Sequence, residues 1–427
     1  MAIDIPASAG TFQTSDDYPL GRGRARLAFA MTFALMLSDY LSRQVIGAVF
    51  PLLKADWGLS DAQLGSLVSV TSLTVAVMSF PLALLSDRIG RVKSITLMAA
   101  VWGLATIASG LAQGFVALFA ARAVIGLAEA GYGGAGAAIL TRLYPARAHA
   151  SVLGTFISAA MFGSVLGVVL GGVLAKSLGW QGAFFVVGAI GVVLALLFPL
   201  AVKEPQDAAP AGAAAPAQLP FMQVLRGALS RRTTVLTLLA AGFGAFIQGA
   251  LISWSPSYLN RYYGLDTPKA AMGAAVVVLC CGVGMVLAGM LADRLGRNVQ
   301  SSRLWLSMAY CTACGLLLLA GFTLPPGSAQ IALVCAGAFL SGAFMGPSAA
   351  MVASLVPKGV HASALSLYTL FVALIGLAPA PFVIGILADR FGLQIAMQIV
   401  PSMSLLAAAI YVLAARSMAA PAPTQPE

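Results

Sequence analysis

The chain contains one charged stretch twice. Its first copy is Ala83-Leu84-Leu85-Ser86-Asp87-Arg88-Ile89-Gly90-Arg91, and its second copy, at an offset of 206 residues, is Gly289-Met290-Leu291-Ala292-Asp293-Arg294-Leu295-Gly296-Arg297. In each copy an acid is followed by two arginines within four residues, directly after a long apolar run. A repeat of this length indicates a chain built from two related halves.

Three further matches extend the repeat in both directions. At the same offset of 206, Gly58-Leu59 corresponds to Gly264-Leu265. At 212, Pro145 with His149-Ala150-Ser151 corresponds to Pro357 with His361-Ala362-Ser363, and at 213, Gly172-Val173-Leu174-Ala175 with Gly179 corresponds to Gly385-Ile386-Leu387-Ala388 with Gly392. Because the offset is nearly constant, the halves match along their length, which is the parallel-repeat plan of one class of secondary transporter.

Composition places this repeat in a membrane. Of the 427 residues, 60% are hydrophobic and only 9% are charged, and the mean hydropathy is +0.93. A soluble globular protein is about 25% charged, because its surface must stay hydrated. The composition therefore excludes a cytosolic enzyme, a nucleic-acid-binding domain and a disordered scaffold, and it predicts a polytopic membrane protein.

Twelve apolar stretches are long enough to cross the bilayer as helices. They cover about 27–53, 62–86, 93–113, 115–141, 150–175, 182–201, 233–258, 268–292, 301–322, 329–355, 361–388 and 393–415. The repeat groups them as a cytoplasmic tail (1–26), a six-helix bundle (27–202), a cytoplasmic linker (203–232), a second six-helix bundle (233–415) and a cytoplasmic tail (416–427).

The basic residues predict the orientation. With an even number of spans, 17 Lys and Arg residues fall on the side of the two termini, five fall on the other side, and Arg43 and Arg122 lie inside spans. Cytoplasmic loops carry the excess of Lys and Arg. We therefore expect both termini in the cytoplasm and the chain in a cell membrane, as in a bacterial inner membrane.

Four charged residues fall inside the predicted spans: Asp39, Arg43, Arg122 and Glu129. All lie in the first half, and the second half has no core charge of its own. A charged side chain at mid-bilayer costs about 2.5 to 3.5 kcal/mol on an insertion scale, so such residues are functional by default. Two interpretations stay open, namely ion pairs that hold helix 1 to helix 4, or a transport site.

Helix geometry predicts how these charges are layered. At 1.5 Å per residue, Arg43 lies about 15 Å and Arg122 about 10 Å from the outer edge, and both acids lie about 21 Å from it. A guanidinium suits a carboxylate or sulfonate, and an anion that arrives there frees a nearby acid to take a proton. We therefore expect an organic anion on Arg43 and Arg122 and a coupling proton on Glu129, shared with Asp39.

The repeated stretch resembles the inner-loop signature of the major facilitator superfamily. Asp87-Arg88-Ile89-Gly90-Arg91-Val92-Lys93 matches the signature after helix 2, and Asp293-Arg294-Leu295-Gly296-Arg297 matches its weaker copy after helix 8. Ala83 stands where the signature usually has glycine. The similarity runs from about Leu27 to Arg416 and implies an all-α membrane protein with twelve transmembrane helices in two six-helix bundles.

The resemblance also implies a gate at the inner face. In the superfamily the signature Asp contacts the end of a helix in the other half, and the arginines pair with nearby acids. The corresponding gating residues are Asp87, Arg88, Gly90, Arg91, Asp293, Arg294 and Arg297. An acid at a helix amino terminus contributes about 0.3 to 1 kcal/mol, so such a gate opens at low cost.

Two stretches are similar to the organic anion/proton symporters and the bacterial spinster-like carriers. They are Arg122-Ala123-Val124-Ile125-Gly126-Leu127-Ala128-Glu129-Ala130 on helix 4 and Arg43-Gln44-Val45-Ile46 on helix 1. Both groups usually carry Asp directly before the helix 1 arginine. Here that position is Ser42, and the acid, Asp39, lies one turn away on the same helix face.

The same resemblance places the rest of the pocket against helices 7, 10 and 11. Gln248, Tyr258 and Tyr368 are the candidate substrate contacts there. The alternative is that these polar side chains bind each other in helix contacts.

The sequence thus predicts a secondary transporter that takes up a small organic anion with H+. We expect it to work as a monomer in the lipid bilayer, driven by the proton gradient, with no cofactor, no metal, no nucleic-acid partner and no catalytic residue. Transport of a lysolipid or another amphiphile is one alternative. Drug/proton efflux is another, although Val168 follows Gly167 where the antiporter signature of helix 5 has Gly-Pro. A membrane enzyme or a sensor is disfavoured because catalytic motifs and an appended signalling domain are absent.

Overall fold

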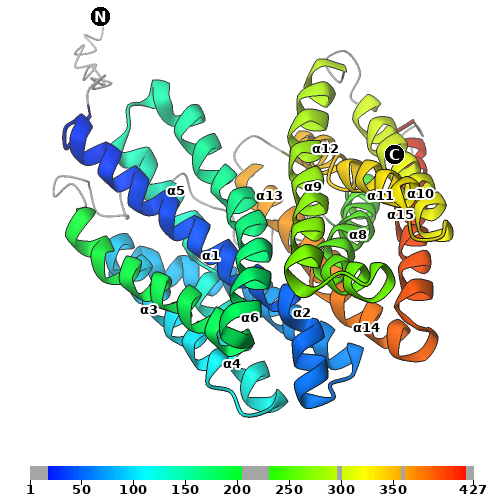
Figure 1. Cartoon of the computed structure of the whole chain (residues 1–427). Helices are drawn as coiled ribbons and strands as arrows, with labels where there is room; N and C mark the ends of the chain where they lie inside the picture. Colours follow the sequence, from blue (N-terminus) through cyan, green and yellow to red (C-terminus); the bar gives the residue numbers. More distant parts are fainter. Residues whose placement is uncertain (1–17, 204–228, 230, 296–300, 357–360, 420–427) are drawn as a thin grey trace, which may run out of the picture.

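The computed structural model describes residues 18–203, 229, 231–295, 301–356 and 361–419. All regular elements within these ranges are helical, and they form two bundles that lie side by side (Figure 1). The N-terminal bundle consists of α1 (Arg22–Trp57), α2 (Asp61–Ile89), α3 (Arg91–Gly110), α4 (Phe115–Glu129), α5 (Tyr132–Leu143), η1 (Ala146–Ala148) and α6 (His149–Ala201). The C-terminal bundle consists of α8 (Arg232–Tyr263), α9 (Thr267–Leu295), α10 (Ser302–Thr323), α11 (Ser328–Leu340), α12 (Met345–Ser354), α13 (His361–Phe371), η3 (Val372–Leu377), α14 (Pro379–Phe391) and α15 (Leu393–Ala419).

These helices fit the twelve predicted crossings. Ten stretches of the described residues are long and apolar enough to span a membrane. One of them contains the 53-residue α6, which would extend about 80 Å as a single helix and therefore exceeds one bilayer. Gly179, with φ 73° and ψ 167°, breaks α6 into two crossings, and the 36-residue α1 supplies another. The all-α fold predicted from the sequence is confirmed, and the described helices are compatible with the predicted count of twelve crossings.

Three crossings that the sequence predicts as single helices are interrupted near their middle. Helix 4 is split into α4 and α5 at Ala130 and Gly131, and helix 10 is split into α11 and α12 at 341–344. Helix 11 contains the π-helical segment η3 between α13 and α14. Interrupted helices at the centre of transporters and π-helical segments both occur frequently at functional sites. The break in helix 4 directly follows Glu129.

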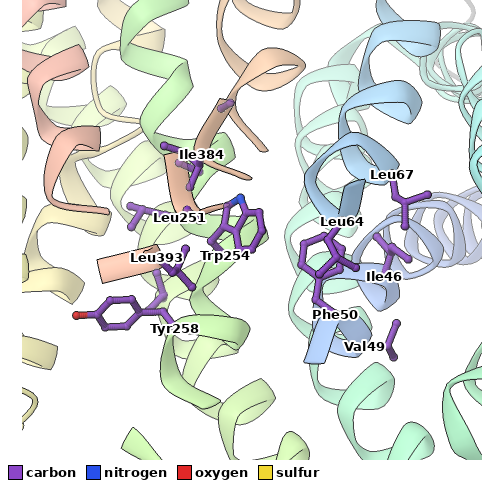
Figure 2. Packing of buried hydrophobic residues seen from close by; sticks show 14 of the residues in the cluster. Ile46, Val49, Phe50, Leu64, Leu67, Leu251, Trp254, Tyr258, Ile384 and Leu393 are labelled. Carbon is purple, nitrogen blue, oxygen red and sulfur yellow. The ribbon is translucent and has the colours of Figure 1, made fainter. Parts of the chain in front are cut away.

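The two bundles share one apolar core at the end that is expected to face outside. The ring centroids of Phe50 on α1 and Trp254 on α8 lie 5.4 Å apart, and both side chains are completely buried. Figure 2 shows Phe50 and Leu64 of one bundle opposite Trp254 and Leu251 of the other. At Gly65 the backbones approach so closely that a Cβ atom there would collide with the carbonyl oxygen of Pro381 on α14. This end of the molecule is therefore closed.

A set of ion pairs crosses between the bundles at the same end. The Asp61 carboxylate accepts two hydrogen bonds from Arg261 of the other bundle, at 2.7 and 2.6 Å, and one from Lys54 at 2.6 Å. In return, Asp389 on α14 accepts hydrogen bonds from the backbone N–H groups of Asp61 and Ala62, at 2.7 and 2.9 Å. Asp389 thus binds the amino terminus of α2, where a carboxylate is favoured.

A second ion pair joins α6 to the loop before α9. The Lys176 ammonium donates a hydrogen bond to Asp266 at 2.8 Å and holds the pKa of that carboxyl below its usual value. Because the folded-state pKa is lowered, the contact weakens only as the pH falls through that lowered value. Toward the opposite end, where α1 begins, the ribbons of the two bundles diverge (Figure 1).

The close approach at Gly65 makes closure of the outer end sensitive to one methyl group. We expect Gly65→Ala to hold the bundles apart there and to slow transport, because the added Cβ meets the backbone of Pro381. Spin labels at positions 55 and 269 will report a longer distance in this variant by pulsed EPR. Gly154→Ala on α6 is the matched control, since its Cβ meets nothing within 4 Å. An unchanged distance in Gly65→Ala would contradict the expectation.

Candidate functional site

The four core charges are gathered in the N-terminal bundle around Arg43. Its Nε lies 3.1 Å from Asp39 Oδ1 on the same helix and 2.8 Å from Glu129 Oε2 on α4. Both acids are 2% exposed. Arg43 therefore joins two buried carboxylates from two helices at one depth, in place of the separate arginine and acid layers predicted from residue counting.

Ser42 completes the contact between α1 and α4. Its hydroxyl oxygen lies 2.8 Å from the carbonyl oxygen of Asp39 and 3.2 Å from Glu129 Oε1, so its single proton is shared between these acceptors. In the position where the resemblance expects an acid, this chain thus has a neutral hydrogen-bond donor. Glu129 receives one hydroxyl bond and one ion pair, and its negative charge is enclosed.

Arg122 is placed quite differently from Arg43. It is 1% exposed, and its guanidinium nitrogens face the backbone carbonyl oxygens of Leu67, Ser42 and Arg43, each at 3.4 Å. Thr71 on α2 donates a hydrogen bond to the Arg122 carbonyl oxygen at 3.0 Å. Among the described residues no carboxylate lies within ion-pair distance of Arg122. Its side chain fastens α4 to α1 and α2, away from solvent.

Arg43 keeps one edge of its guanidinium available. Its side chain is 22% exposed, and only Nε donates hydrogen bonds or ion pairs to the acids. No residue in the described ranges accepts a hydrogen bond from Nη1 or Nη2. The Tyr40 ring, which the sequence reasoning missed, lies 5.0 Å from the guanidinium carbon and stacks on it. The signal was present in the sequence, because positions 40 and 43 are helical neighbours at i and i+3.

The three candidates in the C-terminal bundle do not share one position. The Tyr258 hydroxyl accepts a hydrogen bond from the buried Gln330 side chain at 3.0 Å, and in Figure 2 its ring points away from the N-terminal bundle. The Tyr368 hydroxyl is bound to Ser348 Oγ at 2.8 Å. Both tyrosines thus have partners within their own bundle. Gln248 is half-buried, and its amide has no hydrogen bond in the described part of the chain.

Gln248 lies close to the depth of Arg43. An ideal Cβ at Gly47 on α1 would lie 3.4 Å from the Ser253 carbonyl oxygen on α8, so these two residues mark a common level. Arg43 is four residues before Gly47, and Gln248 is five residues before Ser253, which places both about 6 to 7.5 Å further inward. The site thus lies just inside the apolar contact that closes the outer end.

The residues predicted to form the gate lie at the carboxyl-terminal ends of α2 and α9, which are expected to face inside. Arg88 and Arg294 are exposed, Arg91 is half-buried, and Gly90 has φ 89°, a left-handed value that suits glycine. Arg297 and the side chains of Asp87 and Asp293 lie outside the described part. The inner-face contact predicted for these acids therefore stays a prediction.

Known proteins resemble the chain over most of its length. The sequence pattern of the Major Facilitator Superfamily matches residues 32–381. An "MFS-type efflux pump" of Mycolicibacterium smegmatis is 27% identical over 379 residues, which are 86% of each chain. The "D-galactonate transporter" of Escherichia coli O6:H1 is 24% identical over 436 residues, covering 96% of this chain and 98% of the relative.

A solved structure has the same fold. It is a bacterial homolog of the human lysosomal transporter Spinster in an inward-facing and unoccupied conformation. The TM-score is 0.84 at 23% sequence identity, over 94% of this chain and all of the other. The two proteins therefore share one fold.

The buried contacts of Arg122 predict a defect in stability. Arg122→Gln removes the donor from three backbone carbonyl groups in the buried helix contact, and we expect a loss of about 1 to 3 kcal/mol of stability. Thermal unfolding of the detergent-purified protein will show this as a lower Tm. Arg416→Gln is the control with the same change of charge, and its effect on Tm should be smaller because Arg416 is exposed at the end of α15. Equal losses of Tm in both variants would refute this distinction.

Proposed function

Because the chain belongs to the major facilitator superfamily, we propose that this transporter carries a small organic anion into the cell together with H+ by alternating access. The observation that carries the proposal is the open edge of Arg43. Nη1 and Nη2 form a fork that matches a carboxylate, and this fork is separate from the Nε atom that binds the two acids. The relative that is named for transport of D-galactonate, a sugar carboxylate, supports the same substrate class.

The two acids supply the link to the proton. Glu129 and an incoming anion compete for the same guanidinium, because Glu129 Oε2 lies 2.8 Å from Arg43 Nε. When the anion binds, it weakens the hold of Arg43 on Glu129, and the freed carboxylate takes a proton. Release of the anion inside restores the ion pair and expels the proton. Asp39 keeps Arg43 oriented throughout, because both residues are on α1.

The second wall of the site comes from the C-terminal bundle. Gln248 is the candidate that keeps an unbonded amide near the depth of Arg43, and we propose that it binds hydroxyl or carboxylate oxygens of the substrate. Tyr258 and Tyr368 do not contact the substrate in this proposal, because their hydroxyl groups are bound to Gln330 and Ser348 within the same bundle. In this proposal the chain works as a monomer in a bacterial inner membrane, with both termini in the cytoplasm.

Neutralising Glu129 tests the proton coupling. We expect Glu129→Gln to abolish accumulation of substrate driven by a pH gradient, because no proton can bind or leave at that position. Exchange of labelled for unlabelled substrate across the membrane should survive, because the Arg43 fork is retained. Both are measured in proteoliposomes with a sugar carboxylate as the probe. Accumulation with unchanged pH dependence would exclude Glu129 as the coupling site.

Proton-coupled efflux is the second candidate, favoured by the similarity to the efflux pump of Mycolicibacterium smegmatis. The same exchange of anion and proton at Arg43 can run in an antiport sequence. The two candidates differ in the direction of proton movement. For uptake, we expect external substrate to acidify the interior of cells that carry the protein, as reported by an internal pH-sensitive dye. Alkalinisation by external substrate would assign the protein to antiport.

A further inference from the structure

The core charges of the described residues sum to zero. Asp39 and Glu129 carry the two negative charges, and Arg43 and Arg122 the two positive ones. The other charged side chains in the described ranges lie at the ends of the helices, as Lys54 and Arg261 do at the outer end. Gln248 of the C-terminal bundle, which we propose as the second wall of the site, is neutral. The charge of the whole site is therefore set by these four residues and by whatever binds to them.

The two cations differ in how their charge is compensated. Arg43 is bound to Asp39 four residues earlier on α1, at 3.1 Å, so this pair moves as one unit in any rearrangement of the bundles. Arg122 is bound to backbone carbonyl oxygens, and its charge is balanced across the cluster by Glu129. Protonation of Glu129 therefore leaves the site with one uncompensated positive charge.

No other charged group near Glu129 can offset this charge. α2 and α3, which pack against α4, carry no acid or base between 62 and 86 or between 94 and 110, and α5 and the first crossing of α6 carry none at the depth of the site. The remaining titratable neighbours are Tyr40 and Tyr132, which are neutral phenols. The cluster thus has two relevant states, with net charge 0 when Glu129 is ionised and +1 when it is protonated.

Resting on the proposed function, we infer that the substrate is a monovalent anion carried with one proton, so that each transported unit is electroneutral. A proton on Glu129 and one negative charge on the Arg43 fork return the cluster to zero. A divalent anion would leave it at −1, and a proton alone would leave it at +1. Buried net charge is unfavourable, so the proton and the monoanion favour each other's binding, and the reciprocity holds in both directions.

The closing experiment compares two sugar acids of equal chain length in proteoliposomes. The probes are a six-carbon aldonate with one carboxylate and the corresponding aldarate with two. With an inward proton gradient, we expect uptake of the aldonate to follow the pH gradient and to be unchanged by an inside-negative potassium diffusion potential. Uptake of the aldarate should be slower and should fall further when the potential is applied.

The outcomes separate the inference from the proposed function. Faster aldonate uptake at an inside-negative potential would mean more than one proton per anion and would overturn the inference while leaving proton-coupled anion uptake intact. Preferred uptake of the aldarate would overturn it as well. If neither acid is taken up with the proton gradient, the proposed function itself fails for these substrates.

Asp39→Asn tests the charge rule within the cluster. This variant raises the net charge by one, so the protonated site carries +2 and matches a dianion. We expect the ratio of aldarate to aldonate uptake to rise by about 5- to 150-fold, the usual range of coupling between sites. Arg416→Gln, a single charge change at the end of α15, should leave the ratio unchanged. If Asp39→Asn is active and its ratio of aldarate to aldonate uptake is unchanged, the inference that the loaded cluster has zero net charge is overturned. If the variant is inactive, the effect of the membrane potential on aldonate uptake by the natural protein tests the inference instead.

Discussion

The site depends on one guanidinium that binds two buried carboxylates from different helices. Arg43 Nε lies within 3.1 Å of both Asp39 and Glu129, and this contact sets the distance between α1 and α4 at the centre of the bundle. Two acids confined in low dielectric repel each other, and an arginine between them offsets this repulsion. In the proposed function, the interaction that packs the two helices is also the one that an incoming anion alters.

The outer closure shows how the duplicated halves diverged chemically while keeping their geometry. Lys176 and Asp389 occupy matching positions of the repeat, at an offset of 213. Lys176 binds Asp266 just before α9, whereas Asp389 binds the backbone N–H groups at the start of α2. At each position a side chain thus reaches from its own bundle to the start of a helix in the other bundle, but the two side chains carry opposite charges. The same contact between the bundles is therefore made twice, and each time it consists of polar groups that water can hydrate when the bundles separate.

Much of this architecture follows from the sequence, and the exceptions have physical causes. The repeat and the apolar runs predict the twelve crossings, and the i, i+4 spacing predicts the pairing of Asp39 with Arg43. Counting 1.5 Å per residue reports depth alone, so it carried no information on the direction in which Arg122 points, toward the carbonyl groups of α1 and α2. Nor does apolar periodicity report the break after Glu129, where small residues permit several backbone paths. Tyr258 and Tyr368 bind Gln330 and Ser348, which lie on other helices of the bundle. A local sequence pattern does not predict such pairs.

The division of charge between the bundles bears on how alternating access works here. Every core charge of the described residues belongs to the N-terminal bundle, and the C-terminal bundle packs against that bundle with apolar side chains such as Trp254. Because this surface of the C-terminal bundle is neutral, it forms no ion pair with the core charges that would have to break when the two bundles move relative to each other. The ion pairs that must break lie at the outer end. The Lys176–Asp266 pair is exposed, so solvent screens it and its net contribution is small, whereas the Asp61 carboxylate is buried between Arg261 and Lys54. If the proposed function holds, the barrier to reorientation therefore has two parts, the buried Asp61 pairs and the charge of the Arg43 cluster, which is most favourable to bury when its net charge is zero.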